Sequence, residues 1–207
     1  MQVLKKGVNK ILRALLLVIS ALIIAINAPA IFVGAEKVAD RCVFIYRVAK
    51  LQAQTPDGRL ELPVAGINKS QIADTWHVPR NGDRLHEGQD IFARRGTPVL
   101  SATDGYVLRI GKNNLGGQTV SVLGAGGRVY YYAHLDSHAP NLTAWDHVTT
   151  HTVLGYVGDT GNAAGGPAHL HFGVYGRGGA LNPLPLLDDR PKETDLDSSP
   201  AASKRKR

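Results

Sequence analysis

The sequence AHLHFGVY, residues 168–175, alternates two kinds of side chain. Successive side chains of a β-strand point to opposite faces, so Leu170 and Phe172 would enter a hydrophobic core while His169 and His171 face the other way. Two neighbouring imidazoles on a strand otherwise suited to burial need a partner, and a metal ion supplies one. The stretch therefore predicts a strand with one core face and one face that carries a polar site.

Short runs of β-branched and aromatic residues, separated by turns rich in Gly or Asp, continue from Leu60 to Leu187. No helical period is sustained in this region, and short strands divided by turn residues are typical of all-β domains. A chain of 207 residues has room for one such domain with attachments at its ends. We therefore predict one all-β domain over residues 60–187.

The N-terminal end carries an apolar segment, Ala14 to Gly34, with no charged residue in 21 positions. That length is sufficient to cross a hydrocarbon core of about 30 Å. A basic cluster between Lys5 and Arg13 precedes it and should remain cytoplasmic, so the rest of the chain should be exported. Residues 1–35 are predicted to be a transmembrane signal anchor or a cleaved signal peptide, and both alternatives remain open.

The regions flanking the predicted domain differ in composition from it. Residues 36–59 predict a juxtamembrane helix and linker, and residues 188–207, rich in Asp, Pro and Ser, predict a disordered tail. The formal net charge of +7 comes mainly from the two ends, because 14 Lys and Arg face 12 Asp and Glu between Glu36 and Leu187. A nearly neutral body argues against nucleic acid as a partner. Cys42 is the only cysteine, so no intrachain disulfide can form.

Two further segments complete a possible metal site. The segment LHEGQDI carries His86 and Asp90, and in an extended strand or loop their even spacing puts both on one face. In the segment YYYAHL, the same alternation would put Tyr132 and His134 together. A catalytic zinc takes three protein ligands and keeps one position open for water, and imidazole and carboxylate groups suit it. The remaining histidines would then move protons.

The order of these motifs resembles the lysostaphin-like, or LytM-type, peptidoglycan zinc metallopeptidases, which have the duplicated hybrid motif fold. The matching motifs are His86-x-x-x-Asp90, Tyr-Ala-His134-Leu, Gly158-Asp-Thr-Gly161-Asn and His169-Leu-His171-Phe, within about Pro63 to Leu186. The resemblance implies a compact antiparallel β-sandwich or barrel-like peptidase domain with a groove over the metal. It also implies that His86, Asp90 and His171 bind one Zn²⁺ and that His134 and His169 are catalytic.

The same resemblance implies a zinc-dependent endopeptidase that hydrolyses peptide cross-links of bacterial peptidoglycan. We expect a D,D cross-link rather than a glycine bridge, because no wall-binding module is recognisable. The alternative is a catalytically idle LytM-type activator of a cell-wall amidase, although every ligand position is filled here. Candidates for contacts with the peptidoglycan stem peptides are Tyr132, Asn162 and Arg80. The expected location is the periplasmic or extracellular side of the cell envelope, with the membrane contacted through the N-terminal segment and an amidase or regulatory protein as a possible partner.

Overall fold

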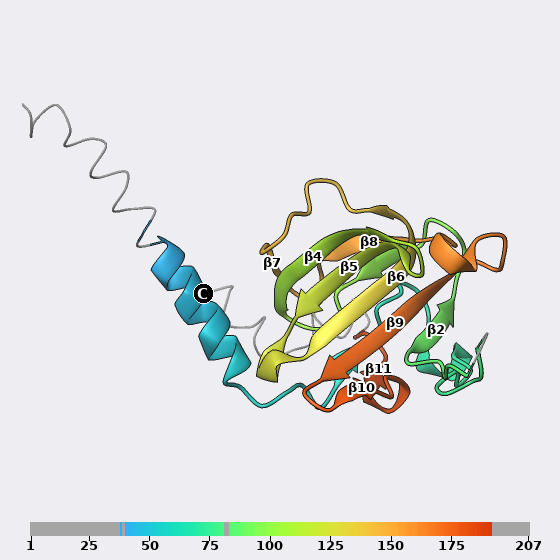
Figure 1. The fold of residues 1–207 in the computed structure, drawn as a ribbon, viewed down its shortest axis with the longest axis horizontal. Coiled ribbons are helices and arrows are strands. Elements are labelled where there is room, and N and C mark those ends of the chain that lie inside the picture. Colours follow the sequence, from blue (N-terminus) through green and yellow to red (C-terminus); the bar gives the residue numbers. More distant parts are fainter. Residues whose placement is uncertain (1–37, 39, 81–82, 192–207) are drawn as a thin grey trace, which may run out of the picture. The chain divides into compact units, whose positions relative to one another are not determined.

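The computed structural model describes residues 38, 40–80 and 83–191 (Figure 1). The chain divides into two units, residues 1–49 and 50–207, which are described separately. Residues 40–52 are helical, within the region predicted to be a juxtamembrane helix and linker. Among the described residues, no helix combines the length and the apolar character needed to cross a membrane. The predicted anchor, Ala14 to Gly34, lies outside them.

The second unit consists mainly of short strands and four single turns of 3₁₀ helix. Its strands are β1 (Leu60–Glu61), β2 (Gln89–Phe92), β3 (Pro98–Leu100), β4 (Gly105–Asn113), β5 (Gly117–Leu123), β6 (Val129–His138), β7 (His147–Val148), β8 (Val153–Val157), β9 (His169–Gly176), β10 (Gly179–Leu181) and β11 (Leu187–Asp188). The 3₁₀ turns are η1 (Lys69–Gln71), η2 (Ala125–Gly127), η3 (Gly161–Ala163) and η4 (Leu184–Leu186). The predicted all-β architecture of this unit is confirmed.

Nine of these strands form one branched antiparallel sheet. Its main path runs β10-β9-β6-β5-β4-β7, while β2 pairs with β9, and β8 joins β6 to β3. The branch lies at β6, whose first half pairs with β9 and whose last residues pair with β8 after a shift of register. The predicted antiparallel structure is confirmed, but in the part of the chain that the structure describes β10 and β7 do not pair, so the sheet does not close into a barrel. A separate parallel pair joins β1 to β11.

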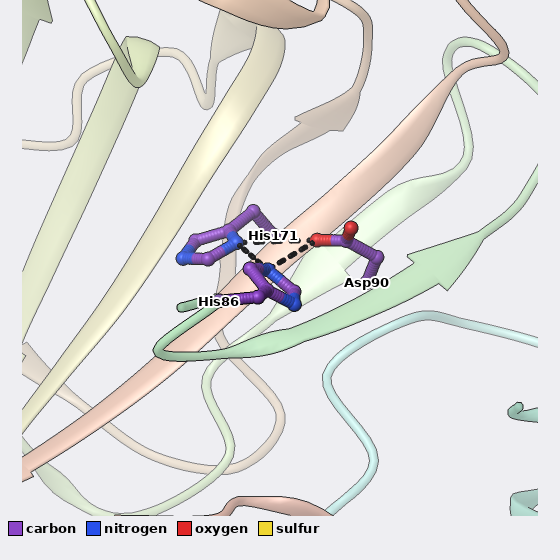
Figure 2. Close-up of side chains that lie close together, drawn as sticks. All are labelled: His86, Asp90 and His171. Carbon is purple, nitrogen blue, oxygen red and sulfur yellow. Dashed lines mark hydrogen bonds and ion pairs between the residues drawn. The ribbon is translucent and has the colours of Figure 1, made fainter. Parts of the chain in front are cut away.

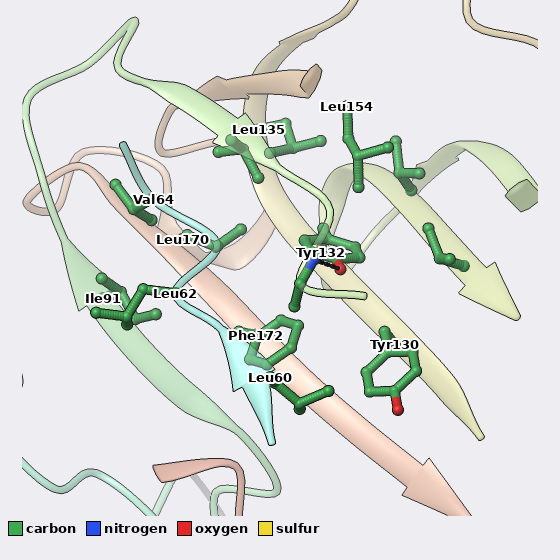
Figure 3. Close-up of a cluster of buried hydrophobic side chains, with 14 of the residues drawn as sticks. Leu60, Leu62, Val64, Ile91, Tyr130, Tyr132, Leu135, Leu154, Leu170 and Phe172 are labelled. Atoms are coloured by element: carbon green, nitrogen blue, oxygen red, sulfur yellow. Dashed lines mark hydrogen bonds between the residues drawn. The ribbon is translucent and has the colours of Figure 1, made fainter. Parts of the chain in front are cut away.

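One face of β9 and β6 contributes to the hydrophobic core, as Figure 3 shows. Leu170 and Phe172 of β9 are fully buried, as are Tyr130 and Tyr132 of β6. The Phe172 ring lies 5.2 Å from the Tyr132 ring and 6.4 Å from the Tyr130 ring, measured between centroids. The alternation in residues 168–175 therefore predicted the core face of β9 correctly.

The folded domain extends beyond Leu187, although the composition of residues 188–207 predicted a disordered tail. Asp188 pairs with β1, and the guanidinium of Arg190 donates hydrogen bonds to backbone and side-chain oxygens of three separate segments. The acceptors include the Leu62 carbonyl at 2.6 Å and the Ser101 carbonyl at 2.9 Å. Composition alone did not predict these contacts of Arg190, because an arginine among Asp and Pro residues is typical of solvated tail sequence.

Candidate metal centre

Strand pairing brings the three predicted ligands to one place. β2 and β9 are antiparallel, and Asp90 lies directly opposite His171, so both side chains emerge on the same face of the sheet. His86, just before β2, is held by two backbone hydrogen bonds: His77 donates to the His86 carbonyl at 2.9 Å, and His86 donates to the Val78 carbonyl at 3.1 Å. Figure 2 shows the His86 and His171 rings and one oxygen of Asp90 converging on the same point.

The three converging atoms form a nearly equilateral triangle. His86 Nε2 lies 2.8 Å from His171 Nδ1 and 3.0 Å from Asp90 Oδ1. His171 Nδ1 lies 3.1 Å from Asp90 Oδ1. Donor atoms at this mutual spacing can all contact one ion at the roughly 2.0–2.2 Å typical of zinc bonded to nitrogen and oxygen. The cluster therefore has the donor types and the spacing of a metal site.

Counting protons shows why the triangle suits a cation. His86 Nδ1 lies 2.6 Å from the Thr75 carbonyl oxygen, which can only accept, so a neutral His86 carries its proton there. A neutral His171 can then contribute only the proton on its Nδ1, which points toward His86 Nε2 and Asp90 Oδ1. No proton is left between His86 Nε2 and Asp90 Oδ1, so their lone pairs face each other. A bound cation would satisfy all three atoms, and the donor set of two imidazoles and one carboxylate fits zinc.

The charges around Asp90 favour its ionised form. Burial of Asp90 alone would raise its pKa, but hydrogen bonds and charge interactions from His171 and His86 outweigh burial, so the pKa lies far below its usual range. Burial lowers the pKa of His171 and outweighs the raising effect of Asp90, which favours the neutral imidazole that binds metals. The second carboxylate oxygen of Asp90 accepts a hydrogen bond from Arg80. Arg80, predicted as a substrate contact, is thus paired with a predicted ligand.

The two predicted catalytic histidines lie beside this cluster. His169 Nε2 is 3.8 Å from Asp90 Oδ1, and the His134 ring is 5.0 Å from the His169 ring and 5.8 Å from the His171 ring. His134 Nδ1 donates to the Thr160 carbonyl and His169 Nδ1 to the Pro167 carbonyl, both at 2.8 Å. A carbonyl oxygen only accepts, so each imidazole in its neutral form carries its proton on Nδ1. Burial lowers the pKa of His134 to about 4, so this side chain is neutral near pH 7.

The structure does not bring Tyr132 to the histidines. Its side chain is fully buried, and its hydroxyl accepts a hydrogen bond from the Ala102 amide at 2.9 Å. The aromatic ring beside the cluster is that of Tyr131, 6.3 Å from the His171 ring. The expected alternation fails because the pairing of β5 with β6 shifts register between Tyr132 and Leu135, and His134 has φ 61°. This bulge turns His134 to the face of Tyr131.

Asn162, another predicted substrate contact, is exposed in η3. Its backbone amide donates to the Leu115 carbonyl at 3.0 Å, so η3 is fastened to the turn between β4 and β5. The groove predicted over the metal remains a prediction.

Several groups around the site escaped the sequence analysis. They are Tyr131, the carbonyls of Thr75, Thr160 and Pro167, and Gly88, where an added Cβ would lie 2.4 Å from His171 Cε1. The Gly88 requirement has a possible sequence signal, since a glycine stands between two polar ligand candidates. The carbonyl acceptors have none, because every residue carries a carbonyl and only folding selects which one meets an imidazole.

Residues 84–183 match peptidase family M23. The L-Ala--D-Glu endopeptidase of Bacillus subtilis (strain 168) is 36% identical over 124 residues, which are 55% of this chain and 38% of that protein. The DD-carboxypeptidase/endopeptidase Mpg of Neisseria meningitidis serogroup B (strain ATCC 13091 / M2091) is 31% identical over 142 residues, which are 69% of this chain and 30% of that protein. This chain thus spans less than two fifths of the length of either relative.

A zinc containing peptidase from Vibrio cholerae has a similar crystal structure, with a TM-score of 0.50 and 26% identity over 57% of this chain and 37% of that chain. Residues 84–183, which match the family, include β2, β6 and β9, and these strands carry Asp90, His134, His169 and His171. The resemblance inferred from the ordered motifs is therefore confirmed: residues 84–183 of this chain match the domain of peptidase family M23.

Proposed function

We propose that this protein is a zinc-dependent endopeptidase that hydrolyses peptide cross-links in bacterial peptidoglycan. The observation that carries the proposal is the arrangement of five side chains on one face of the sheet. Three of them, His86, Asp90 and His171, meet at mutual distances of 2.8–3.1 Å. The other two, His134 and His169, lie next to them, each with Nδ1 hydrogen-bonded to a backbone carbonyl. A metal site bordered by two imidazoles that can accept or donate a proton is an arrangement suited to hydrolysis.

His86, Asp90 and His171 would hold the metal through the three atoms of the triangle. A zinc ion bound there supplies Lewis-acid activation of a water molecule and of the scissile carbonyl. Other groups of the protein orient two of these ligands: the Thr75 carbonyl fixes the tautomer of His86, and Arg80 binds the outer oxygen of Asp90. These contacts orient the ligands before a metal binds, which reduces the cost of assembling the site.

We assign proton acceptance to His134 and oxyanion stabilisation to His169. His134 is buried and neutral, and its free Nε2 can take the proton of the attacking water and deliver it to the leaving amine. His169 is less buried, and its Nε2 lies 3.8 Å from Asp90 Oδ1, beside the metal cluster. A protonated His169 can donate a hydrogen bond to the developing oxyanion.

The bond we propose is a D,D cross-link between stem peptides. A relative whose name describes a DD-carboxypeptidase/endopeptidase aligns with 69% of this chain and supports this choice. The Bacillus subtilis relative is named for a different bond, between L-Ala and D-Glu, which makes that bond the main competitor. The two activities release fragments of different mass, so one digestion separates them.

We further propose that the protein acts at the cell envelope, facing the wall, and that residues 1–35 direct it there.

The test is digestion of purified, cross-linked peptidoglycan by the full chain loaded with zinc, with and without a chelator, followed by mass spectrometry of the soluble fragments. D,D hydrolysis converts cross-linked dimers into monomers with intact stem peptides. L-Ala–D-Glu hydrolysis instead releases peptides that lack the L-alanine. We expect the first pattern, abolished by the chelator and restored by added zinc.

The His151→Ala variant is a matched control, because His151 is exposed on the turn after β7 and lies outside the cluster. It should digest peptidoglycan like the unaltered chain. If the zinc-loaded chain leaves the wall intact but stimulates an added amidase, the protein is an activator of the idle LytM type and the hydrolase proposal is wrong.

A further inference from the structure

His134 occupies a backbone conformation that a residue with a side chain rarely adopts. Its φ is 61°, in the left-handed region, which is strained for a non-glycine residue and persists only where the surroundings enforce it. Glycine would adopt this conformation without strain, but it would offer no imidazole. The strained histidine must therefore be held by specific contacts.

Two backbone carbonyls from separate loops supply those contacts. The His134 amide donates to the Gly116 carbonyl at 2.7 Å, and His134 Nδ1 donates to the Thr160 carbonyl at 2.8 Å. Gly116 belongs to the turn between β4 and β5, whereas Thr160 precedes η3. The first bond fixes the backbone of His134, and the second fixes the rotation and the tautomer of its ring.

The hydroxyl of Thr160 fastens its own backbone to the same strands. Thr160 Oγ1 accepts a hydrogen bond from the Gln118 amide at 2.9 Å and donates to the Leu135 carbonyl at 2.7 Å. Leu135 is the residue after His134, so the side chain of Thr160 ties the carbonyl acceptor to the strand that carries the imidazole. The contact is close: a Cβ added at Gly117, which has φ 62°, would lie 2.1 Å from Thr160 Oγ1.

Two ion pairs made by Arg95 also connect the segment before η3 to β6. Arg95 donates to Asp136 Oδ1 and pairs with Asp159, which immediately precedes Thr160. Asp136 lies two residues after His134 on β6. The exposed guanidinium therefore reinforces the link that the Thr160 hydroxyl makes inside the domain, although exposed ion pairs contribute little by themselves.

From these contacts we propose that Thr160 is a positioning residue: it holds His134 in its strained conformation with Nδ1 protonated and with Nε2 free to accept a proton. The proposal rests on the proposed function, since it takes His134 to be the proton acceptor. It adds a residue whose hydrogen bonds reach His134, Leu135 and Gln118 rather than the three proposed metal ligands. It also explains why a threonine stands at a site where a turn alone would accept many residues.

The test compares Thr160→Val with Thr160→Ser in the full zinc-loaded chain. Valine keeps the shape of threonine but removes both hydroxyl hydrogen bonds, whereas serine keeps them. For Thr160→Val we expect unchanged zinc content, KM within about twofold, and kcat lower by about tenfold or more, in the range typical of a perturbed acid-base group. Thr160→Ser should recover kcat to within about threefold. Thr103→Val is the matched control, because Thr103 is a buried threonine between β3 and β4 whose hydroxyl donates to Asp57 Oδ2 at 2.6 Å, a contact that involves neither Thr160 nor His134.

A second measurement does not depend on turnover, and its first part uses only the unaltered chain. Nitrogen NMR of the imidazoles should show His134 as a single tautomer protonated at Nδ1 in the unaltered chain and as a mixture in Thr160→Val. A His134 protonated at Nε2 in the unaltered chain, or Thr160→Val with an unchanged tautomer and kcat, would overturn the proposal. If the tautomer responds as expected but the unaltered chain does not hydrolyse peptidoglycan, the proposed function fails while the positioning role stands.

Discussion

The two faces of β9 carry side chains in the same alternating register but are stabilised in different ways. On one face, Leu170 and Phe172 are fully buried among apolar and aromatic groups, so the gain from burial is non-directional and spread over many contacts. On the other, His169 and His171 depend on a few directed contacts with Asp90 and with backbone carbonyls. The core face supports the fold, whereas the polar face gathers donor atoms that a bound cation would satisfy.

The largest effect is expected on the polar face. Replacing His171 by Ala removes one of three metal donors and leaves the other two too few to retain zinc. We expect His171→Ala to lose bound zinc in metal analysis and all detectable peptidoglycan hydrolysis. Stoichiometric zinc in this variant would remove His171 from the ligand set, and His151→Ala provides the reference for a histidine outside the site.

The next effect separates metal binding from proton transfer on the same face. His134→Asn should keep zinc but lower kcat by about 10²–10⁴, because the proton acceptor is lost. Asparagine tolerates the left-handed backbone of His134 better than alanine does, so a paired His134→Ala variant measures the contribution of strain. Rates near that of the unaltered chain in His134→Asn would end its catalytic assignment.

The core face should respond in stability rather than in metal affinity. Phe172→Ala removes a fully buried ring and should lower the free energy of unfolding by about 3–5 kcal/mol. Denaturant unfolding measures this change, and zinc content at low temperature should remain stoichiometric. Phe172→Leu, which retains most of the volume, should cost less. Equal losses of zinc in Phe172→Ala and His171→Ala would show that the two faces are not independent.

The smallest effect concerns the outer oxygen of Asp90. Arg80→Ala removes the hydrogen bond that holds this oxygen, so zinc affinity should fall by about 10–100-fold, as for other groups that orient metal ligands. Competition with a fluorescent zinc chelator measures the affinity. Arg84→Ala is the neighbouring control, because Arg84 is exposed. Unchanged affinity in Arg80→Ala would leave Arg80 available as the substrate contact that the sequence suggested.

Local sequence determined much of the fold because strand alternation is a local property. The period of two in residues 168–175 predicted which side chains of β9 enter the core, and the same reasoning applied to His86 and Asp90 predicted a shared face. The ordered motifs also indicated the family, since those residue types in that order are uncommon by chance. These inferences needed no knowledge of which strands are neighbours.

Tertiary structure decided the features that depend on a partner strand or loop. A bulge turns His134 to the face of the sheet that carries Tyr131 rather than Tyr132. Sequence alternation cannot reveal this bulge, because it arises from the pairing of β5 with β6. Contacts between distant segments also produce the branching of the sheet at β6 and the hydrogen bonds of Arg190. They likewise produce the hydrogen bond that His134 Nδ1 donates to the Thr160 carbonyl. Sequence determined which chemical groups the site contains, and folding determined their orientation, because hydrogen bonds to backbone carbonyls depend on position rather than residue type.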